Sequence, residues 1–314
     1  MRNQEMYDVL LSDFQIRKGK KRKLRFINFI ENRCEDLGLS CRVEEKSGLF
    51  YNRNIVVGDI NKAHVIFTAH YDTCALMPFP NFITPKNIFF YILYQLFVIG
   101  IIIGISYGVA YLATFFISDG YFKLILNLAF LVQLIQIMLG YPNKHTANDN
   151  TSGVATLLSL MHRIPIEERN KVAFVFFDNE EVGLIGSSAF KKLHKKELAD
   201  KLFINFDCVS DGDTFLFVSK KKALSSEEHP LFKQILEENA QIFGRNIEFA
   251  KTSHAFYPSD QILFSKSIAV ASLKRAPVIG LYIDRVHTLG DTRFDRNNIE
   301  YLCSSFTRFV SEIS

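Results

Sequence analysis

The stretch Val172–Ser187 reads VAFVFFDNEEVGLIGS and combines a structural signal with a chemical one. Its first six residues are all apolar, and an unbroken apolar run of this length is typical of a strand buried on both faces of a sheet. Two adjacent carboxylates, Glu180 and Glu181, follow the run, and a helix is predicted over Gly186–Lys195. The stretch therefore predicts a buried strand, then a helix, with a pair of acids between them.

Four other residues of metal-binding type stand in comparable surroundings. They are His70 in VIFTAHYDT, Asp149 in TANDNTSG, Asp207 in LFINFDCVS and His287 in LYIDRVHTLGDT. We expect each of them, like Glu181, to lie where a hydrophobic strand ends. In an open α/β sheet, ligands bind outside the carboxyl ends of the strands, so residues distant in sequence can meet there. The sequence thus predicts one metal site built from all five.

The composition of this set indicates two ions. Two imidazoles and three carboxylates exceed the three protein ligands that a catalytic zinc typically has. Two ions that share a bridging carboxylate would fit the count, and hydrolytic sites of this kind hold their ions about 3.5–4 Å apart. Glu180 can supply the general base, because successive side chains at a strand end point to opposite sides. Asp72 is placed to accept the second N–H of His70 and to fix the orientation of its ring.

The motifs AHYDT, ANDNTSGV, FFDNEEVGLIGS, NFDCV and VHTLGDT, in this order, resemble the M28 family of co-catalytic zinc aminopeptidases. The resemblance covers roughly residues 60–295, apart from one large insertion. It implies a peptidase with two zinc ions, which Mn²⁺ or Co²⁺ could replace, acting on peptides from their N-terminal end. It also implies a role for each residue: Asp149 bridges the ions, His70 and Asp207 complete one site, Glu181 and His287 complete the other, Glu180 is the general base, and Asp72 supports His70.

One segment departs from the family pattern. Many members have Asp-His where this chain has Asp260-Gln261. Asp260 therefore remains a candidate substrate-pocket or structural residue, and no role is carried over to Gln261. The 80 residues between Asp207 and His287 leave no room for the lid domain of the related M20 carboxypeptidases, which favours the M28 branch.

The insertion predicts a transmembrane helical hairpin over residues 87–140. Asn87–Ile117 contains no Asp, Glu, Lys, Arg or His, SDG at 118–120 is a turn signal, and Tyr121–Leu139 is again largely apolar. About 20 apolar residues can span a bilayer as a helix. A buried core helix is also apolar all round, but the 31 residues of the first segment exceed ordinary helix lengths. Three polar residues of the second segment are expected to face the partner helix or the protein rather than lipid: Asn127, Gln133 and Gln136.

Residues 1–86 and 141–314 form the predicted catalytic domain. Strands are predicted over 40–45, 53–60, 64–72, 171–178, 201–207, 214–219, 267–273 and 278–284. Helices are predicted over 4–38, 152–163, 186–195, 229–243 and 297–312. This alternation indicates an α/β fold, with a mostly parallel mixed sheet and helices on both faces.

Charge and cysteine content limit the partners and the compartment. The net charge of +4 is too small to indicate a nucleic-acid partner. The basic run RKGKKRK, Arg17–Lys23, is predicted to cover the exposed face or start of the first helix, and a weaker reading is contact with anionic lipid. Five cysteines without a CxxC pair indicate buried thiols in a reducing compartment rather than disulfides.

These features place the protein in the cell membrane, with residues 87–140 in the bilayer and a peptide as substrate. The chain is charged from Arg2 onward and shows no signal-peptide pattern, and a hairpin returns to the side that it left. The catalytic domain is therefore expected on the cytoplasmic side. Two alternatives are weighed: a glutaminyl cyclase-like aminoacyltransferase and a non-catalytic receptor or scaffold. The first works with one metal, and the second tends to lose ligands, whereas all five candidates are kept here. No pattern indicates an oligomeric state.

Overall fold

The computed structural model describes residues 3–48 and 50–313 of the chain. Residues 1, 2, 49 and 314 lie outside it, so Arg2 and the predicted outer limits of the catalytic domain lie outside the described residues. A mixed sheet with the order β1-β2-β4-β3-β5-β8-β6-β7 forms the centre, and β9 pairs with β8. The strands are β1 Cys41–Lys46, β2 Asn52–Val57, β3 Val65–His70, β4 Val172–Phe177, β5 Leu202–Phe206, β6 Thr214–Ser219, β7 Asn246–Lys251, β8 Ser267–Ala276 and β9 Gly280–Tyr282.

The middle of the sheet is parallel, antiparallel pairs adjoin it on both sides, and the last pair on one side, β6 with β7, is again parallel. β3 pairs in parallel with β4 and β5, and β5 pairs in parallel with β8. β2 joins β4, β1 joins β2, and β6 joins β8 in antiparallel fashion. The predicted mixed α/β sheet is confirmed. The sequence reading missed β7, because Asn246, Glu248 and Lys251 interrupt its apolar pattern and leave it only partly buried.

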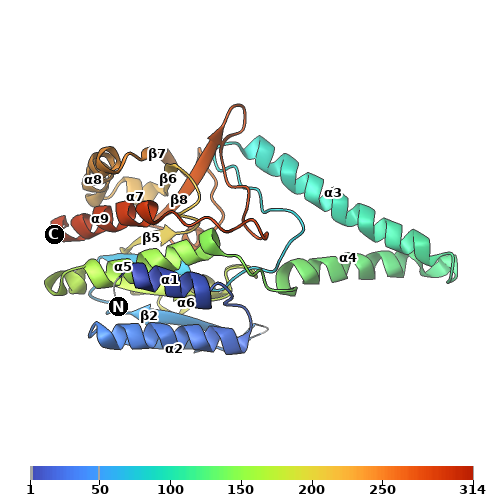
Figure 1. Ribbon diagram of the computed structural model, residues 1–314, viewed down its shortest axis with the longest axis horizontal. Helices are drawn as coiled ribbons and strands as arrows, with labels where there is room; N and C mark the ends of the chain where they lie inside the picture. Colours follow the sequence, from blue (N-terminus) through green and yellow to red (C-terminus); the bar gives the residue numbers. More distant parts are fainter. Residues whose placement is uncertain (1–2, 49, 314) are drawn as a thin grey trace.

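Helices cover both faces of the sheet (Figure 1). They are α1 Asn3–Asp13, α2 Lys20–Asp36, α3 Ile88–Ala113, α4 Phe122–Leu139, α5 Gly153–Arg163, α6 Ile185–Leu193, α7 Lys221–Leu224, α8 Glu228–Phe243 and α9 Arg296–Glu312. Buried side chains of α1, α2, α5, α8 and α9 form one core with the strands, and Phe190 of α6 belongs to a second core on the other face. Phe67 and Ile66, neighbours on β3, point to these two cores, as the alternation of a strand requires.

The N-terminal region differs from its prediction in two ways. The expected helix over 4–38 is two helices, α1 and α2, and the break ends at Gly19, whose φ of 82° is left-handed and suits glycine. Arg17, expected on an exposed face, is completely buried in this break. Its guanidinium donates to the carbonyls of Tyr71 and Phe14 and to Thr151 Oγ1 at 2.9 Å. Two of these partners, Tyr71 and Thr151, come from distant parts of the chain, so the local pattern could not indicate the burial.

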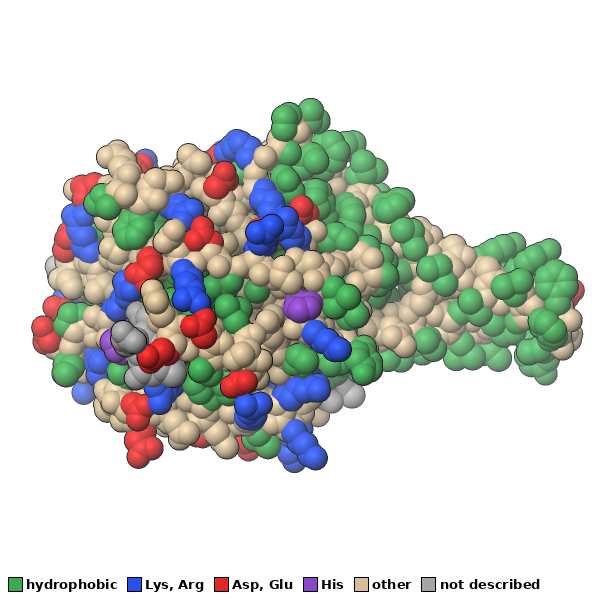
Figure 2. Space-filling model, viewed as in Figure 1, with side chains coloured by type: hydrophobic (Ala, Val, Ile, Leu, Met, Phe, Trp, Pro, Cys, Tyr) green, Lys and Arg blue, Asp and Glu red, His purple; other side chains and the backbone are tan. Residues whose placement is uncertain are grey.

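The insertion forms the two predicted helices, α3 and α4, which extend from the domain as a hairpin (Figure 1). Both are long and apolar enough to cross a membrane, with mean hydropathies of 2.5 and 2.0. At about 1.5 Å per residue, α3 is about 39 Å long. Its one buried face, Val98, Ile102, Ser106 and Ala110, repeats every four residues. Most remaining apolar side chains of the hairpin are exposed, as the green surface in Figure 2 shows.

Polar groups of the hairpin behave differently from one another. Gln133 Nε2 donates to Ser106 Oγ at 2.8 Å and to the carbonyl of Ile102 at 3.2 Å, so it faces the partner helix as expected. Asn127 and Gln136 are exposed, and the prediction that they face the partner helix or the protein is wrong. The face of α4 that contacts α3 includes Gln133, whereas Asn127 and Gln136 lie outside this face.

The first turns of α3 are docked on the domain. Tyr94 Oη donates to the carbonyl of Pro80 at 2.6 Å, and its ring lies 5.3 Å from that of Phe82. The ring of Tyr91 lies 5.9 Å from that of Phe256. The hairpin is therefore packed against the domain at its base and is not joined to it by a loose linker.

Candidate metal centre

Three neighbouring parallel strands bring most of the predicted ligands to one edge of the sheet. His70 is the last residue of β3, Asp207 directly follows β5, and Glu181 lies four residues after β4. β3 lies between β4 and β5, and His70 is in register with Phe177, the last residue of β4. The carboxyl ends of parallel strands meet at this edge, which explains the convergence.

Asp149 reaches the same place by another route. It lies in the turn Ala147–Ser152, directly before α5, so the prediction that it follows a strand is wrong. The carboxylate of Asp291 holds this turn, because it accepts the backbone N–H of Asn148 at 2.8 Å and that of Asp149 at 3.0 Å. Sequence reasoning missed Asp291, although it stands four residues after His287 in the quoted motif VHTLGDT. It fixes the backbone that presents Asp149.

The carboxylate of Asp149 stands between two histidines. His70 Nε2 lies 3.3 Å from Asp149 Oδ1 and 3.8 Å from Asp207 Oδ1. His287 Nε2 lies 3.2 Å from Asp149 Oδ2 and 3.1 Å from Glu181 Oε2. Each oxygen of Asp149 thus faces a different set of ligand atoms. The five predicted ligands therefore lie together, as two sets that share one carboxylate.

Asp72 connects the two strand ends at this site. His70 Nδ1 lies 3.2 Å from the carbonyl oxygen of Asp72 and 3.6 Å from its Oδ1. The Asp72 carboxylate also accepts the backbone N–H groups of Glu180 at 3.0 Å and Glu181 at 3.3 Å. Beyond supporting the histidine, Asp72 holds the segment that carries both glutamates.

The two glutamates are not separated by strand alternation. β4 ends at Phe177, and the chain turns through Asn179, whose φ is 57°, before it reaches them. Ligand atoms of His70, Glu180 and Glu181 all lie within 4.8 Å of one another. Both carboxylates therefore face the same cluster. The expectation that they point to opposite sides, as successive residues of a strand do, is wrong. Their roles as base and ligand stay a prediction.

The donor set suits divalent cations. Six carboxyl groups, those of Asp72, Asp149, Glu180, Glu181, Asp207 and Asp260, surround two imidazoles in the interior. Buried charge of one sign requires compensation, and imidazole with carboxylate is a ligand set typical of zinc. Glu181 Oε1 is buried and has no hydrogen-bond partner among the described residues. These residues therefore fit metal ions.

The crowding of carboxyl groups shifts their protonation. Burial lowers the pKa of His70, but the nearby carboxylates, Glu180 foremost, outweigh burial and raise it. Burial raises the pKa of Glu180 well above its usual value, and the negative charges of Asp260 and Glu181 add to the shift. Burial also raises the pKa of Asp260 to about 7. The site thus holds carboxyl groups that accept protons readily.

The Asp260-Gln261 segment packs beneath the cluster. Neither carboxylate oxygen of Asp260 has a hydrogen-bond partner in the described part of the chain, although the side chain is fully buried. Gln261 Oε1 accepts Asn205 Nδ2 at 3.1 Å, and Gln261 Nε2 donates to the carbonyl of Tyr257 at 2.7 Å. Both polar atoms of the Gln261 side chain thus have a hydrogen-bond partner. Asp260 remains a candidate for the substrate pocket.

Two further residues border the site and were not predicted for it. The thiol of Cys74 lies within 4.8 Å of ligand atoms of Glu181 and His287, and burial raises its pKa well above the usual value. Met77 Sδ lies 3.4 Å from His287 Nδ1, and Met77 N donates to the carbonyl of His287 at 2.8 Å. Both follow AHYDT closely, but no spacing rule would have assigned an apolar methionine to a metal site.

Comparisons with known proteins agree with this geometry. The sequence profile of peptidase family M28 matches residues 136–298, more than half of the chain. No curated protein matches the sequence. Similar solved structures include the glutaminyl cyclase of Porphyromonas gingivalis, with a TM-score of 0.62, 15% identity, and 99% of this chain and 98% of that chain covered.

Two further structures have the same fold. A leucine aminopeptidase precursor from Bacteroides thetaiotaomicron has a TM-score of 0.59 and 14% identity, with 100% of this chain and 98% of that chain covered. The glutaminyl cyclase of Fimbriiglobus ruber has a TM-score of 0.60 and 16% identity, with 100% and 96% covered. At these identities the likeness establishes the fold alone, and both reaction types occur among proteins that share it.

Proposed function

Because the chain belongs to peptidase family M28, we propose that it is a membrane-anchored two-zinc metallopeptidase that removes N-terminal residues from short peptides. The observation that carries the proposal is the position of Asp149. Its two oxygens face His70 and His287 at 3.3 and 3.2 Å, each beside a further carboxylate. This arrangement supports two ions that share Asp149, with His70 and Asp207 on one side and Glu181 and His287 on the other.

The chemistry follows from the donor set. Divalent ions bound here would polarise the peptide carbonyl and lower the pKa of a shared water. Glu180 lies within 4.8 Å of His70 and Glu181 and is not needed as a ligand, so it can take a proton from that water and deliver it to the leaving amine.

Contacts at the base of the hairpin support the proposal that the metal centre lies close to the membrane. Leu76 N donates to the carbonyl of Tyr141 at 2.7 Å, next to the end of α4, and the following residue, Met77, contacts His287. Lys18 Nζ donates to the carbonyl of Met138 in the last turn of α4 at 2.8 Å. The segments that border the metal cluster therefore also contact the hairpin. Apolar or membrane-derived peptides would reach this site at a raised local concentration. The cytoplasmic side remains a prediction.

Replacement of residues 87–140 by a flexible Gly/Ser linker should give a domain that no longer needs detergent and still binds zinc. The sheet, both cores and all five ligands lie outside the replaced segment, and loop replacement costs little entropy. A matched variant should keep Ile88–Gln95, because Tyr91 and Tyr94 cover Phe256 and Phe82. Solubility without detergent and zinc content are the measurements. An unfolded product from both variants would show that the domain needs the hairpin in order to fold, so that a description of the hairpin as an anchor alone is incomplete.

A glutaminyl cyclase-like aminoacyltransferase is the second candidate function. The observation in its favour is that the solved structures sharing this fold include several glutaminyl cyclases. The family resemblance implies that such cyclases work with one metal, whereas the residues on the two sides of Asp149 here would suffice for two ions. We therefore favour the peptidase.

One peptide series separates these activities. We expect peptides with a free α-amino group to lose their first residue and N-acetylated versions of the same peptides to resist. A peptide beginning with glutamine should release free glutamine, whereas a cyclase would convert it to the pyroglutamyl peptide with loss of ammonia and no chain cleavage. Mass spectrometry of the products, with zinc-loaded protein in detergent and in liposomes, distinguishes the outcomes.

Four results would contradict parts of the proposal. Equal cleavage of acetylated peptides would exclude the aminopeptidase. Pyroglutamyl product alone would establish the cyclase, and zinc binding without turnover of any peptide would favour a receptor or scaffold. If apolar peptides are cleaved no faster in liposomes than in detergent, the proposal of a membrane-derived substrate is wrong.

A further inference from the structure

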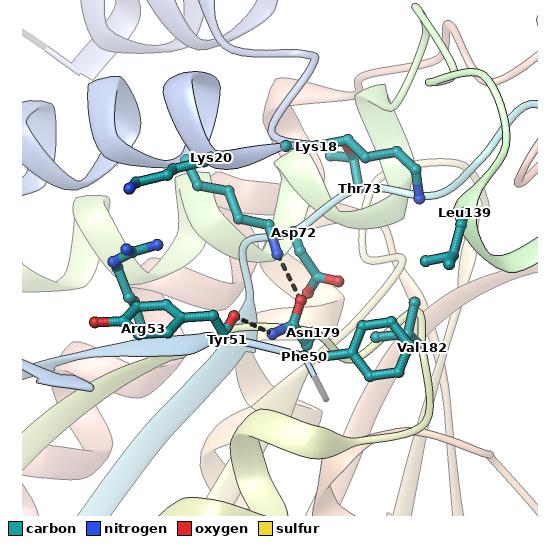
Figure 3. A pocket seen from close by; sticks show the side chains of 12 residues that line it. Lys18, Lys20, Phe50, Tyr51, Arg53, Asp72, Thr73, Leu139, Asn179 and Val182 are labelled. Carbon is teal, nitrogen blue, oxygen red and sulfur yellow. Dashed lines mark hydrogen bonds between the residues drawn. The ribbon is translucent and has the colours of Figure 1, made fainter. Parts of the chain in front are cut away.

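A pocket of about 680 Å³ opens next to Asp72 (Figure 3). It lies between the turn that precedes α2, the start of β2 and the end of α4. Asp72 and Val182, which adjoin His70 and Glu181 in the site, form part of its lining. Its volume is in the range of about 300–1,000 Å³ that is typical of small-ligand pockets. The pocket is therefore large enough for part of a substrate bound at the metal cluster.

The lining combines an apolar wall with cationic groups. The wall consists of Phe50, Leu139 and Val182. Among the cations, Lys23 already pairs with Asp178 at 2.5 Å, and Arg53 pairs with Glu45 at 2.9 Å. An anionic ligand would have to compete with these carboxylates, so neither residue is a strong candidate for binding one.

Lys18 is different. In the described part of the chain no carboxylate lies within salt-bridge distance of its amine, which donates only to the carbonyl of Met138. Figure 3 shows its side chain reaching along the pocket toward Leu139, on the same side as Val182. Burial lowers the pKa of Lys18, although the negative charges of Glu181 and Asp72 act in the opposite direction. A half-buried amine with unused donors next to an apolar wall is suited to an anion on a partly apolar ligand.

We infer that this pocket receives the leaving part of the substrate and that Lys18 binds its C-terminal carboxylate. The inference rests on the proposed peptidase function and deepens it, because it selects dipeptides and tripeptides with a free C-terminus. In such a substrate the α-amine points to the metal cluster. An apolar side chain of the leaving part lies against Phe50 and Val182, and the C-terminal carboxylate binds Lys18. An anionic lipid headgroup could also meet a lysine near the membrane. The adjacency of the pocket to Asp72 and Val182 favours the peptide.

The test compares Leu-Ala with Leu-Ala-amide, which differ only in the terminal charge. Wild-type protein should show a kcat/KM at least about tenfold higher for the free acid, the size expected of one charge-assisted hydrogen bond. In Lys18→Gln this ratio should fall to about one to two, and Lys18→Arg should retain most of it. The ratio is independent of the folded fraction in each preparation.

Lys20→Gln is the matched control. Lys20 has the same charge and lies two residues away, at the start of α2, but Figure 3 shows its side chain directed to the opposite side, above Arg53. The control should keep the wild-type ratio. If Lys20→Gln loses the preference as fully as Lys18→Gln, a general positive field acts and the Lys18 site is wrong.

The remaining outcomes separate this inference from the proposed function. Equal rates for the acid and the amide in wild-type protein would overturn the inference alone, whereas no hydrolysis of either would overturn the peptidase and the inference together. Vesicles of phosphatidylserine and phosphatidylcholine provide the lipid arm. A loss of activity on phosphatidylserine vesicles in Lys18→Gln, with an unchanged acid-to-amide ratio, would assign Lys18 to the lipid headgroup instead.

Discussion

Glu180→Gln should retain both zinc ions and lose nearly all turnover. The substitution keeps the size of the side chain and removes its ability to accept a proton, and loss of a general base typically lowers the rate by a factor of about 10²–10⁴. Glu180 lies within the cluster, but in the proposed centre the two ligand sets around Asp149 are complete without it. Zinc content and kcat measured on the same preparation check the prediction.

Glu181→Gln provides the contrast. Glu181 Oε2 lies 3.1 Å from His287 Nε2, so its loss should weaken one ion as well as the rate. If Glu180→Gln loses zinc while Glu181→Gln keeps it, the two roles must be exchanged. The structure makes this a necessary comparison, because both side chains face the same cluster and strand geometry does not separate them.

Asp149→Ala should remove both ions and abolish measurable turnover. In the proposed centre Asp149 is the only ligand common to the two sets, so its effect on kcat should be at least as large as the factor of about 10²–10⁴ expected for the base. Asp207→Ala and His287→Ala are the matched comparisons, since each belongs to one set. They should lose one ion each. Metal analysis of the three variants with circular dichroism as a folding control is the measurement.

A different pattern would contradict the shared role. If Asp149→Ala keeps one ion with near-normal affinity, Asp149 serves a single ion and does not bridge. If all three variants lose both ions, the ligands form one cooperative site that the two-set description does not capture. Asp291→Asn is an informative addition, because Asp291 holds the backbone of Asn148 and Asp149 without facing the histidines.

Most of the fold could be predicted from local pattern. The strand VAFVFF and the ends of β3 and β5 stand out because central strands are buried on both faces and tolerate few polar residues. The hairpin is recognisable because two apolar segments of this length are typical of helices that span a membrane. β7 escaped notice because a flanking strand is only partly buried and can carry Glu248 and Lys251.

The sequence predicts which residue types form the site, but not which neighbouring groups hold them in place. His70, Asp149, Glu181, Asp207 and His287 are all of metal-binding type, and the fold brings them together. The groups that fix them act across long stretches of chain. Asp291 binds the turn of Asp149, and Asp72 binds the backbone of the two glutamates. Such contacts have no local period, so only the three-dimensional structure reveals them.

The central claim is that Asp149 joins two ions, and anomalous diffraction at the zinc edge from crystals of the zinc-loaded protein tests it most directly. We expect two peaks about 3.5–4 Å apart, the separation usual for two-metal hydrolytic sites, one on each side of the Asp149 carboxylate. One peak should lie beside His70 and Asp207, and the other beside Glu181 and His287. A single peak at saturating zinc would contradict the account.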